Sequence, residues 1–261
     1  MAKGKSTRMN AIPSRRPYQG VIQILQFNWR FYVATAGSIG VALLALPFLS
    51  RLGRTVLLLG TAPALFWLAS SLLVSHYVYD RFPLYDLNWV CSVLSRAPRR
   101  WINIHCGLDE TSALLAEIFT DAASQVVDIF DPLVMTETSI RVARRVTHQT
   151  TPSTSMRYDS LTFPAEWFDA AFCIFTAHEL RHHDQRVRLF GEIARTLTPD
   201  GEFILMEHSR DWRNFLAFGP GFLHFFSQCA WRKVASDAGL TVRTELSMTP
   251  FVHAYVLRRA T

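Results

Sequence analysis

The chain has 261 residues, 49% of them hydrophobic, which is enough for one full α/β domain and an additional segment. The formal charge of +6 is unevenly spread, because residues 1–79 hold eight of the 27 basic residues and none of the 21 acidic ones. The remaining 19 basic residues face 21 acidic ones, so the rest of the chain has a net charge of −2 and we expect no nucleic-acid partner. The four cysteines show no short paired spacing, which is typical of reduced cysteines in a cytosolic domain.

Two long uncharged segments stand near the start of the chain. Residues 1–30 are basic, and within them we expect disorder over 1–18 and a short helix at a membrane surface over 21–29. Residues 31–49 and 55–78 carry no charge and are each long enough to cross the hydrocarbon layer. The sequence therefore predicts two transmembrane helices joined by a tight turn.

Two other interpretations of these segments are a cleaved signal peptide and a buried helix pair in a soluble core. A signal peptide has a shorter apolar region, and a core helix pair normally carries polar stripes. Six basic residues precede the first segment and two lie in the turn, so the positive-inside rule places the N-terminus in the cytoplasm. We therefore expect an integral protein of the plasma membrane, the inner membrane if the source is bacterial, with its folded domain in the cytoplasm.

After a linker with a short helix at 80–100, an α/β domain is predicted over 101–261. Its clearest part is residues 160–208, where an apolar run, a helical pattern and a second apolar run follow one another. This order is typical of two parallel strands joined by a crossover helix. We place the strands at 168–175 and 203–206.

The crossover helix has its own start and stop signals. Asp184 can cap its first turn, and Pro199, Asp200 and Gly201 would end it and turn the chain into the next strand. An aromatic stretch at 215–226 is predicted as a loop. Further strands are expected at 101–104, 124–130, before Asp159, 241–246 and 252–257, and further helices at 110–119, from Asp131 to Val146, and up to Ala238.

Two segments resemble a known family. LTFPAEWFDAAF is similar to the LPFPDxSFDxV segment of class I S-adenosylmethionine (SAM) dependent methyltransferases of the type 11/12 kind, and RLFGEIARTLTPDGEFILMEH is similar to their E-x-x-R-x-L-x-P-G-G segment and following strand. The segments NIHCGLDETS and FLAFGPGFLHF resemble those of a divergent, membrane-linked subgroup. The resemblance runs from about Trp101 to the C-terminus. It implies a Rossmann-like seven-stranded sheet with helices on both faces, a final antiparallel hairpin, SAM as cofactor and methyl transfer as reaction.

The same resemblance assigns a cofactor loop to NIHCGLDETS. The family has an acidic residue followed by G-x-G-x-G at this place, so that a glycine-rich backbone can approach the cofactor. Here Asn103 takes the acidic position, Gly107 keeps the central glycine, and His105 and Asp109 replace the other two. One retained glycine is a weak signal by itself.

Two further acids are assigned to the cofactor by the resemblance. Asp131, which we place after the second strand, matches the ribose-binding acid, since a carboxylate can accept both ribose hydroxyls. The same residue can equally be a plain helix N-cap. Asp159 lies near the position of the adenine-binding acid.

Acceptor chemistry is expected where the fourth and fifth strands end. Methyl transfer needs alignment and, for a hydroxyl acceptor, removal of a proton, for which His178 is the candidate base beside Glu179. A solvent-exposed loop histidine is the alternative. Glu207 and His208 at the end of the fifth strand are secondary candidates.

The stretch His178 to His182 also matches the zinc motif H-E-x-x-H. That motif requires a helix, whereas here it directly follows a strand, so we assign no metal ligand.

Three functions follow from these observations. The first is a membrane-anchored SAM-dependent methyltransferase acting on a lipophilic small molecule, with residues 215–222 covering the acceptor, entering the bilayer surface or packing in the core. The second is a catalytically silent relative that serves as a binding or scaffold module. The third, based on the H-E-x-x-H match alone, is a membrane zinc peptidase.

Overall fold

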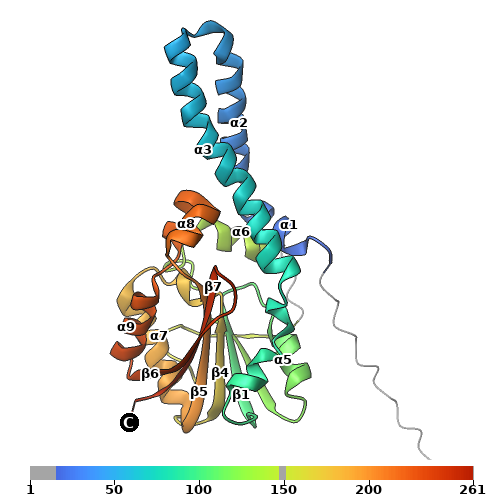
Figure 1. Ribbon diagram of the computed structural model, residues 1–261. Coiled ribbons are helices and arrows are strands. Elements are labelled where there is room, and N and C mark those ends of the chain that lie inside the picture. The colour runs from blue at the N-terminus through green and yellow to red at the C-terminus, as the bar shows by residue number, and fades with distance from the viewer. Residues whose placement is uncertain (1–15, 147–150, 261) are drawn as a thin grey trace, which may run out of the picture.

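The structure, a computed structural model, describes residues 16–146 and 151–260, so the expectation of disorder over 1–18 falls almost wholly outside it. A sheet with helices on both faces forms the domain, and two long helices project from one end of it (Figure 1). The seven strands lie in the order β3 (Thr154–Ser155), β2 (Ala123–Asp128), β1 (Arg100–His105), β4 (Phe168–Ile174), β5 (Leu197–His208), β7 (Val252–Arg259) and β6 (Leu240–Ser247).

Neighbouring strands pair in parallel except at β7, which is antiparallel to both β5 and β6. The predicted sheet and its C-terminal antiparallel hairpin are therefore confirmed. Because β1, β2, β4 and β5 run in one direction, their last residues share one edge of the sheet. In open α/β sheets this edge is where ligands bind.

Two hydrophobic cores lie on the two faces of the sheet, and side chains alternate between them along each strand. Along β4, Ala171 and Cys173 face the first core, whereas Ala170 and Phe172 face the second. Helices α6 (Thr138–Val146), α7 (His183–Thr196) and α9 (Gln228–Asp237) contribute to the first core, and α4 (Trp89–Val93) and α5 (Ser112–Ile118) to the second. The linker contains one short α-helix, α4, of five residues.

The unit β4–α7–β5 is the predicted pair of parallel strands with a crossover helix, but both helix ends differ from the prediction. His182, rather than Asp184, is the N-cap, and it forms a capping box with Gln185. At the other end β5 begins directly at Leu197, and Pro199 to Gly201 lie within the strand, where its pairing register with β4 shifts. The extra residues bulge out of the ladder, so no separate turn is needed.

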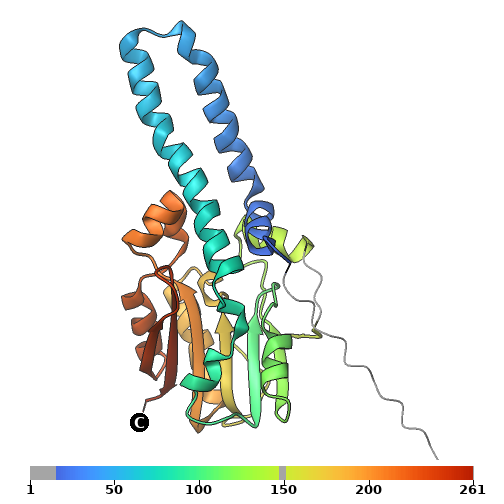
Figure 2. The same ribbon diagram turned by 45° about the vertical axis from the view of Figure 1, so that its right-hand side comes forward.

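The N-terminal segment forms α1 (Gln19–Phe27), α2 (Trp29–Ala45) and α3 (Arg51–His76), with a short 3₁₀ turn η1 (Leu46–Phe48) at the tip of the α2–α3 hairpin (Figure 2). Ser50 caps α3 by accepting a hydrogen bond from the Gly53 N–H at 3.2 Å. The α3 helix continues through η2 (Tyr77–Arg81) and η3 (Leu84–Asp86) into the domain. Asp80 of η2 accepts the Gly20 and Val21 N–H groups at 2.6 and 3.2 Å, so it holds the start of α1 against the base of the hairpin.

The aromatic stretch 215–226 is mostly helical, so the predicted loop is wrong there. It forms most of α8 (Trp212–Phe218) and the 3₁₀ helix η5 (Gly219–His224), because Asp211 caps the first turn by accepting the Asn214 N–H at 2.9 Å. This α8–η5 segment packs on α3, where the rings of Phe215 and Trp67 lie 5.3 Å apart. The hairpin and the domain are thus held together at the base of α3.

Candidate active site

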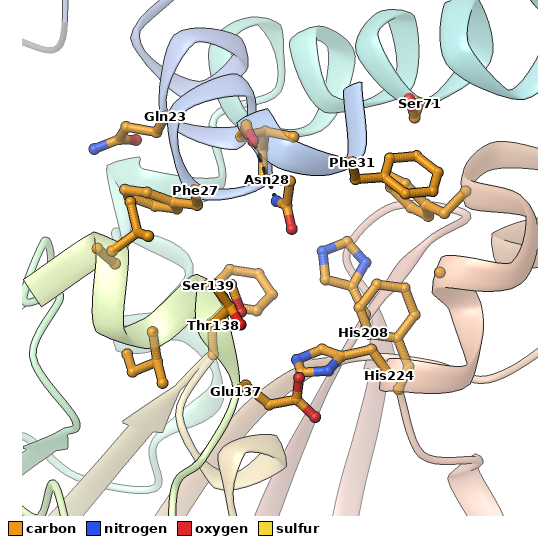
Figure 3. A pocket seen from close by; sticks show the side chains of 18 of the residues that line it. Gln23, Phe27, Asn28, Phe31, Ser71, Glu137, Thr138, Ser139, His208 and His224 are labelled. Carbon is orange, nitrogen blue, oxygen red and sulfur yellow. Dashed lines mark hydrogen bonds between the residues drawn. The ribbon is translucent and has the colours of Figure 1, made fainter. Parts of the chain in front are cut away.

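A cavity of about 820 Å³ lies between the carboxyl edge of the sheet and the base of the hairpin. Figure 3 shows Phe27, Asn28 and Phe31 above this space, Thr138 and Ser139 of the α6 helix across it, and His208 and His224 opposite them. Three further sets of residues line its wall: His105 and Cys106 at the end of β1, His178 and Glu179 after β4, and Tyr32, Trp67 and Leu68 from α2 and α3.

Three of the four predicted catalytic residues form one buried cluster. His178 and Glu179 belong to the 3₁₀ turn η4 (Ala177–Glu179) that follows β4, and Glu207 is the penultimate residue of β5. The Nδ1 atom of His178 lies 2.7 Å from Oε2 of Glu207, whose Oε1 also accepts the His178 backbone N–H at 3.2 Å. The Nε2 atom of His178 lies 3.5 Å from Oε1 of Glu179.

The charges in this cluster set its protonation. Burial opposes a charge on His178, but the carboxylates of Glu207 and Glu179 outweigh it and raise the pKa of His178 to about 10. Burial alone would raise the pKa of Glu179, but the hydrogen bond and charge of His178 lower it. His178 and Glu179 are thus an ion pair at neutral pH. The Oε2 atom of Glu179 has no hydrogen-bond partner within the described residues.

His208, the fourth predicted catalytic residue, is held between two partners. Its Nε2 lies 2.6 Å from the hydroxyl of Tyr79, and its Nδ1 lies 3.1 Å from the carbonyl oxygen of Phe251. Burial, helped by the charge on His178, lowers the pKa of His208 to about 3, so the imidazole is neutral. Its two nitrogens tie β5 to η2 and to the β7 end of the sheet.

A residue that the sequence analysis did not single out, His224, completes the cluster. It ends η5, and its ring lies 5.0 Å from the ring of His178 in an edge-to-face arrangement. Its Nε2 lies 3.9 Å from Oε1 of Glu179, and burial, together with the charge on His178, lowers its pKa to about 3. No short spacing links it to His178, since the two residues lie on segments far apart in the chain.

The H-E-x-x-H interpretation is wrong, because the motif is not on a helix. His178 and Glu179 are in the 3₁₀ turn, while His182 is the extended N-cap of α7. The side chain of His182 is used in the capping box and does not join the cluster of His178, Glu179 and His224. The zinc peptidase hypothesis rested on this motif alone and therefore loses its basis.

The end of β1 and the loop after it carry several buried polar side chains. Asn103 of β1 donates from Nδ2 to Ser112 Oγ at 2.7 Å and to Thr111 Oγ1 at 2.9 Å. His105, the last residue of β1, accepts the Gly107 N–H at its Nδ1, 3.1 Å away, and burial lowers its pKa. Within the described residues, three buried atoms of this region lack a partner: Oδ1 of Asn103, Nε2 of His105 and Oδ2 of Asp109.

The acid that ends β2 is Asp128, not Asp131 as the sequence analysis placed it. Asp131 lies in the following turn, where it accepts the Leu133 N–H at 2.9 Å, and α6 begins only at Thr138, later than predicted. Asp128 is 7% exposed, and both of its carboxylate oxygens accept from Nη1 of Arg144, at 3.0 Å for Oδ1 and 2.8 Å for Oδ2.

Arg144 also covers the loop after β1. Its Nη1 donates to the Cys106 carbonyl at 2.9 Å, and a Cβ atom added to Gly107 would lie 2.3 Å from Arg144 Cγ. Gly107 has φ +126°, a conformation that favours glycine. The retained glycine thus serves both a special backbone conformation and a close contact with an arginine. Asp159, the last predicted cofactor residue, pairs with Arg157 at 2.9 Å and is not among the described residues that line the cavity.

Residues 103–205 match the family model described as a methyltransferase domain, and the strand order with β7 antiparallel agrees with it. The match assigns residues 103–205 to a methyltransferase domain. A solved SAM-dependent methyltransferase from Aquifex aeolicus is 14% identical, with a TM-score of 0.50, and the alignment covers 73% of this chain and 98% of that one. The mitomycin 7-O-methyltransferase MmcR is 15% identical, with a TM-score of 0.55, and the alignment covers 94% of this chain and 73% of that one. At these identities the likeness shows the fold alone, and no curated protein sequence matches the chain.

SAM is the cofactor expected for a methyltransferase domain, and the loop after β1 fits one end of it. SAM carries an ammonium group and a sulfonium, and the unpartnered oxygens of Asn103 and Asp109 are acceptors suited to a cation. The fit at Gly107 requires a movement, because the Arg144 side chain occupies the space directly above that residue. Among the described residues, Asn103, Gly107, Asp109 and Asp128 do not line the cavity, so SAM would reach them only if Arg144 left Gly107 and released Asp128.

Proposed function

We propose that the protein is a membrane-anchored SAM-dependent methyltransferase that acts on a lipophilic small molecule. The observation that carries the proposal is the shared cavity. One continuous space is lined by the loop after β1, by the His178–Glu179 cluster and by the apolar helices α2 and α3. A substrate in it contacts the membrane hairpin and the methyltransferase site at once.

The hairpin supports membrane anchoring by its length, composition and exposure. The segments Trp29–Phe48 and Arg51–Asp86 contain windows of mean hydropathy 1.8 and 1.9, of which 11% and 6% is buried. A helix of a soluble core would be mostly buried, whereas Leu44 and Phe48 at the tip are 75% and 88% exposed. Such a surface matches hydrocarbon better than water.

The orientation follows from charge. The basic residues ahead of α2 outnumber the two arginines in the turn, which places the N-terminus and the domain on the cytoplasmic side. The hairpin base, with Trp29, Tyr32 and Trp67, would then lie at the level of the lipid headgroups. The bilayer is thus the proposed partner of α2 and α3.

The acceptor class follows from the two ends of the cavity. Its hairpin side is apolar and aromatic, with Phe31, Trp67 and Leu68, while its sheet side holds the cluster of His178 and Glu179. A volume of about 820 Å³ suits a ring with an apolar chain. We place the polar, methyl-accepting atom at the cluster and the apolar part along α2 and α3.

The chain's own residues have distinct tasks in this proposal. When bound, SAM supplies an electrophilic methyl group. Asn103 and Asp109 would accept hydrogen bonds from its cationic end, and Asp128 would be the acid for the ribose. Glu207 orients His178, and the unpartnered Oε2 of Glu179 is the atom that can take a proton from a hydroxyl acceptor. In this proposal Asp128 takes the ribose role that the sequence analysis gave to Asp131, and the assignment of Asp159 to the cofactor stays a prediction.

Two measurements on the full-length protein in detergent test the proposal. Titration with SAM and with S-adenosylhomocysteine should show binding that is lost in Asp128→Ala and retained in Asp131→Ala and His178→Ala. Carbonate extraction of membranes should leave the protein in the pellet. If the folded protein binds neither ligand, the proposed methyltransferase activity is contradicted. If carbonate releases the protein from the membranes, the proposed membrane anchoring is contradicted.

A silent binding module is the second candidate, and one observation favours it. Arg144 neutralises Asp128 and fills the space over Gly107, which is the arrangement expected of a closed cofactor site. In that case the cavity would still take a lipophilic ligand. Absence of SAM binding together with binding of a fluorescent fatty acid in the cavity would decide for it.

A further inference from the structure

His178, Glu179 and His224 bring three potential metal-ligand atoms together in the wall of the cavity. One nitrogen from each histidine and one oxygen of Glu179 all lie within 4.8 Å of one another. The Nε2 atoms of His178 and His224 are 3.5 and 3.9 Å from Oε1 of Glu179. A tetrahedral ion with bonds of 2.0–2.1 Å keeps its ligand atoms about 3.3–3.4 Å apart. To complete the site, the two nitrogen–oxygen distances would shorten by up to about half an ångström, and the distance between the two histidine nitrogens, which is at most 4.8 Å, by up to about 1.4 Å.

The hydrogen bonds of the cluster leave the ligand atoms available. His178 directs Nδ1 to Glu207 at 2.7 Å, so its Nε2 points to the side of Glu179 and His224. A metal-bound histidine commonly uses its second nitrogen on a carboxylate in this way. Glu207 therefore stands where an outer partner of a metal ligand is expected.

An unpartnered buried oxygen is the independent sign of a missing ligand. Glu179 is 5% exposed, and its Oε2 has no hydrogen-bond partner among the described residues. An ionised carboxylate that is buried without full pairing is costly. A cation held by both oxygens of the Glu179 carboxylate would satisfy Oε2 as well as Oε1.

The formal charge of the cluster also favours a bound cation. Glu179 and Glu207 bring two negative charges, so one remains even when His178 is protonated. Arg181 compensates only in part, because its guanidinium donates to the carbonyl oxygens of His178 and His224 and lies 3.9 Å from Glu137. A divalent ion in place of the proton would leave the cluster with no net negative charge.

We propose that His178, Glu179 and His224 bind one divalent transition-metal ion, with Glu207 supporting His178 and an open coordination position facing the cavity. Two imidazoles and one carboxylate are the donor set of catalytic zinc sites and of non-haem iron sites, whereas magnesium prefers oxygen ligands. The ion would bind the oxygen of an acceptor or a water molecule and act as a Lewis acid. The inference deepens the proposed function at the acceptor side, where the ion, rather than Glu179, would activate a hydroxyl group.

Metal binding to the untagged full-length protein in detergent, stripped with a chelator, tests the site without any methyl transfer. Titration with Zn²⁺ and with Co²⁺, followed by calorimetry and by the visible spectrum of Co²⁺, should show one ion per chain. Glu179→Gln and His224→Ala should weaken binding by about 100-fold or more, and Glu207→Gln by about 10- to 100-fold. His182→Ala is the matched control, because it removes a neighbouring histidine outside the cluster and should bind like the unaltered protein.

Three results would overturn the site: no ion bound by protein that still unfolds cooperatively, unchanged affinity in Glu179→Gln, or loss of affinity in His182→Ala. Glu179→Gln keeps the shape of the side chain, so it reports on the site even where His224→Ala fails to fold. SAM binding to the metal-free protein separates the two proposals. Intact SAM binding without metal binding refutes the metal site alone, and metal binding without SAM binding refutes the proposed enzyme alone.

Discussion

The ion pair of Asp128 and Arg144 should control both the stability of the domain and its affinity for SAM. Arg144→Met keeps an unbranched apolar side chain but removes the guanidinium, which lies over the Phe130 ring, and leaves the buried carboxylate of Asp128 without its cation. Breaking a fully buried pair costs about 3–5 kcal/mol. The two side chains are 29% and 9% exposed, so we expect about 2 kcal/mol here. For a chain of this size that loss lowers the melting temperature by about 4–8 °C.

The same substitution should improve SAM binding. The unaltered protein must open the pair before Asp128 can accept hydrogen bonds from a ligand, which lowers the apparent affinity by up to the same free energy. Removing the arginine should thus tighten SAM binding by up to about 30-fold. Thermal unfolding with and without SAM in detergent measures both effects.

A double variant provides the control. Asp128→Asn in the Arg144→Met background removes the unpaired charge, so most of the lost stability should return while SAM binding weakens. Unchanged stability in Arg144→Met would refute the importance of the pair. Weaker SAM binding in Arg144→Met would refute its role as a cover and make Arg144 a ligand-binding residue instead.

Two further predictions concern the junction with the hairpin and the buried thiols. Gly219→Ala should destabilise the protein by about 2–4 kcal/mol, because the residue has φ +54° and an added Cβ would lie 2.7 Å from the Trp67 ring. An unchanged free energy of unfolding together with unchanged Trp67 fluorescence would contradict this. Burial raises the pKa of Cys106 and of Cys173, so iodoacetamide at neutral pH should label the two exposed cysteines of the native protein and neither buried one. Peptide mass spectrometry of the native and the unfolded protein measures this labelling. Rapid labelling of either buried thiol would refute its burial.

The sequence by itself determined the elements whose signals are local. A short apolar run defines β4, a helical spacing between Asp184 and Thr196 defines α7, and uncharged runs define α2 and α3, because such runs and spacings are properties of neighbouring residues. The family resemblance added the sheet order. Local signals were less reliable at ends, where His182 replaced Asp184 as the cap and the aromatic stretch 215–226 became helical.

Only the tertiary structure decided which side chains share the site. His224 meets His178 because α8–η5 docks on α3, and Arg144 reaches Gly107 because α6 returns over the ends of β1 and β2. Asp128, rather than Asp131, ends β2 by a difference in strand length that composition does not reveal. These contacts join residues far apart in the chain, so they depend on strand order and helix docking, which no spacing within one segment encodes.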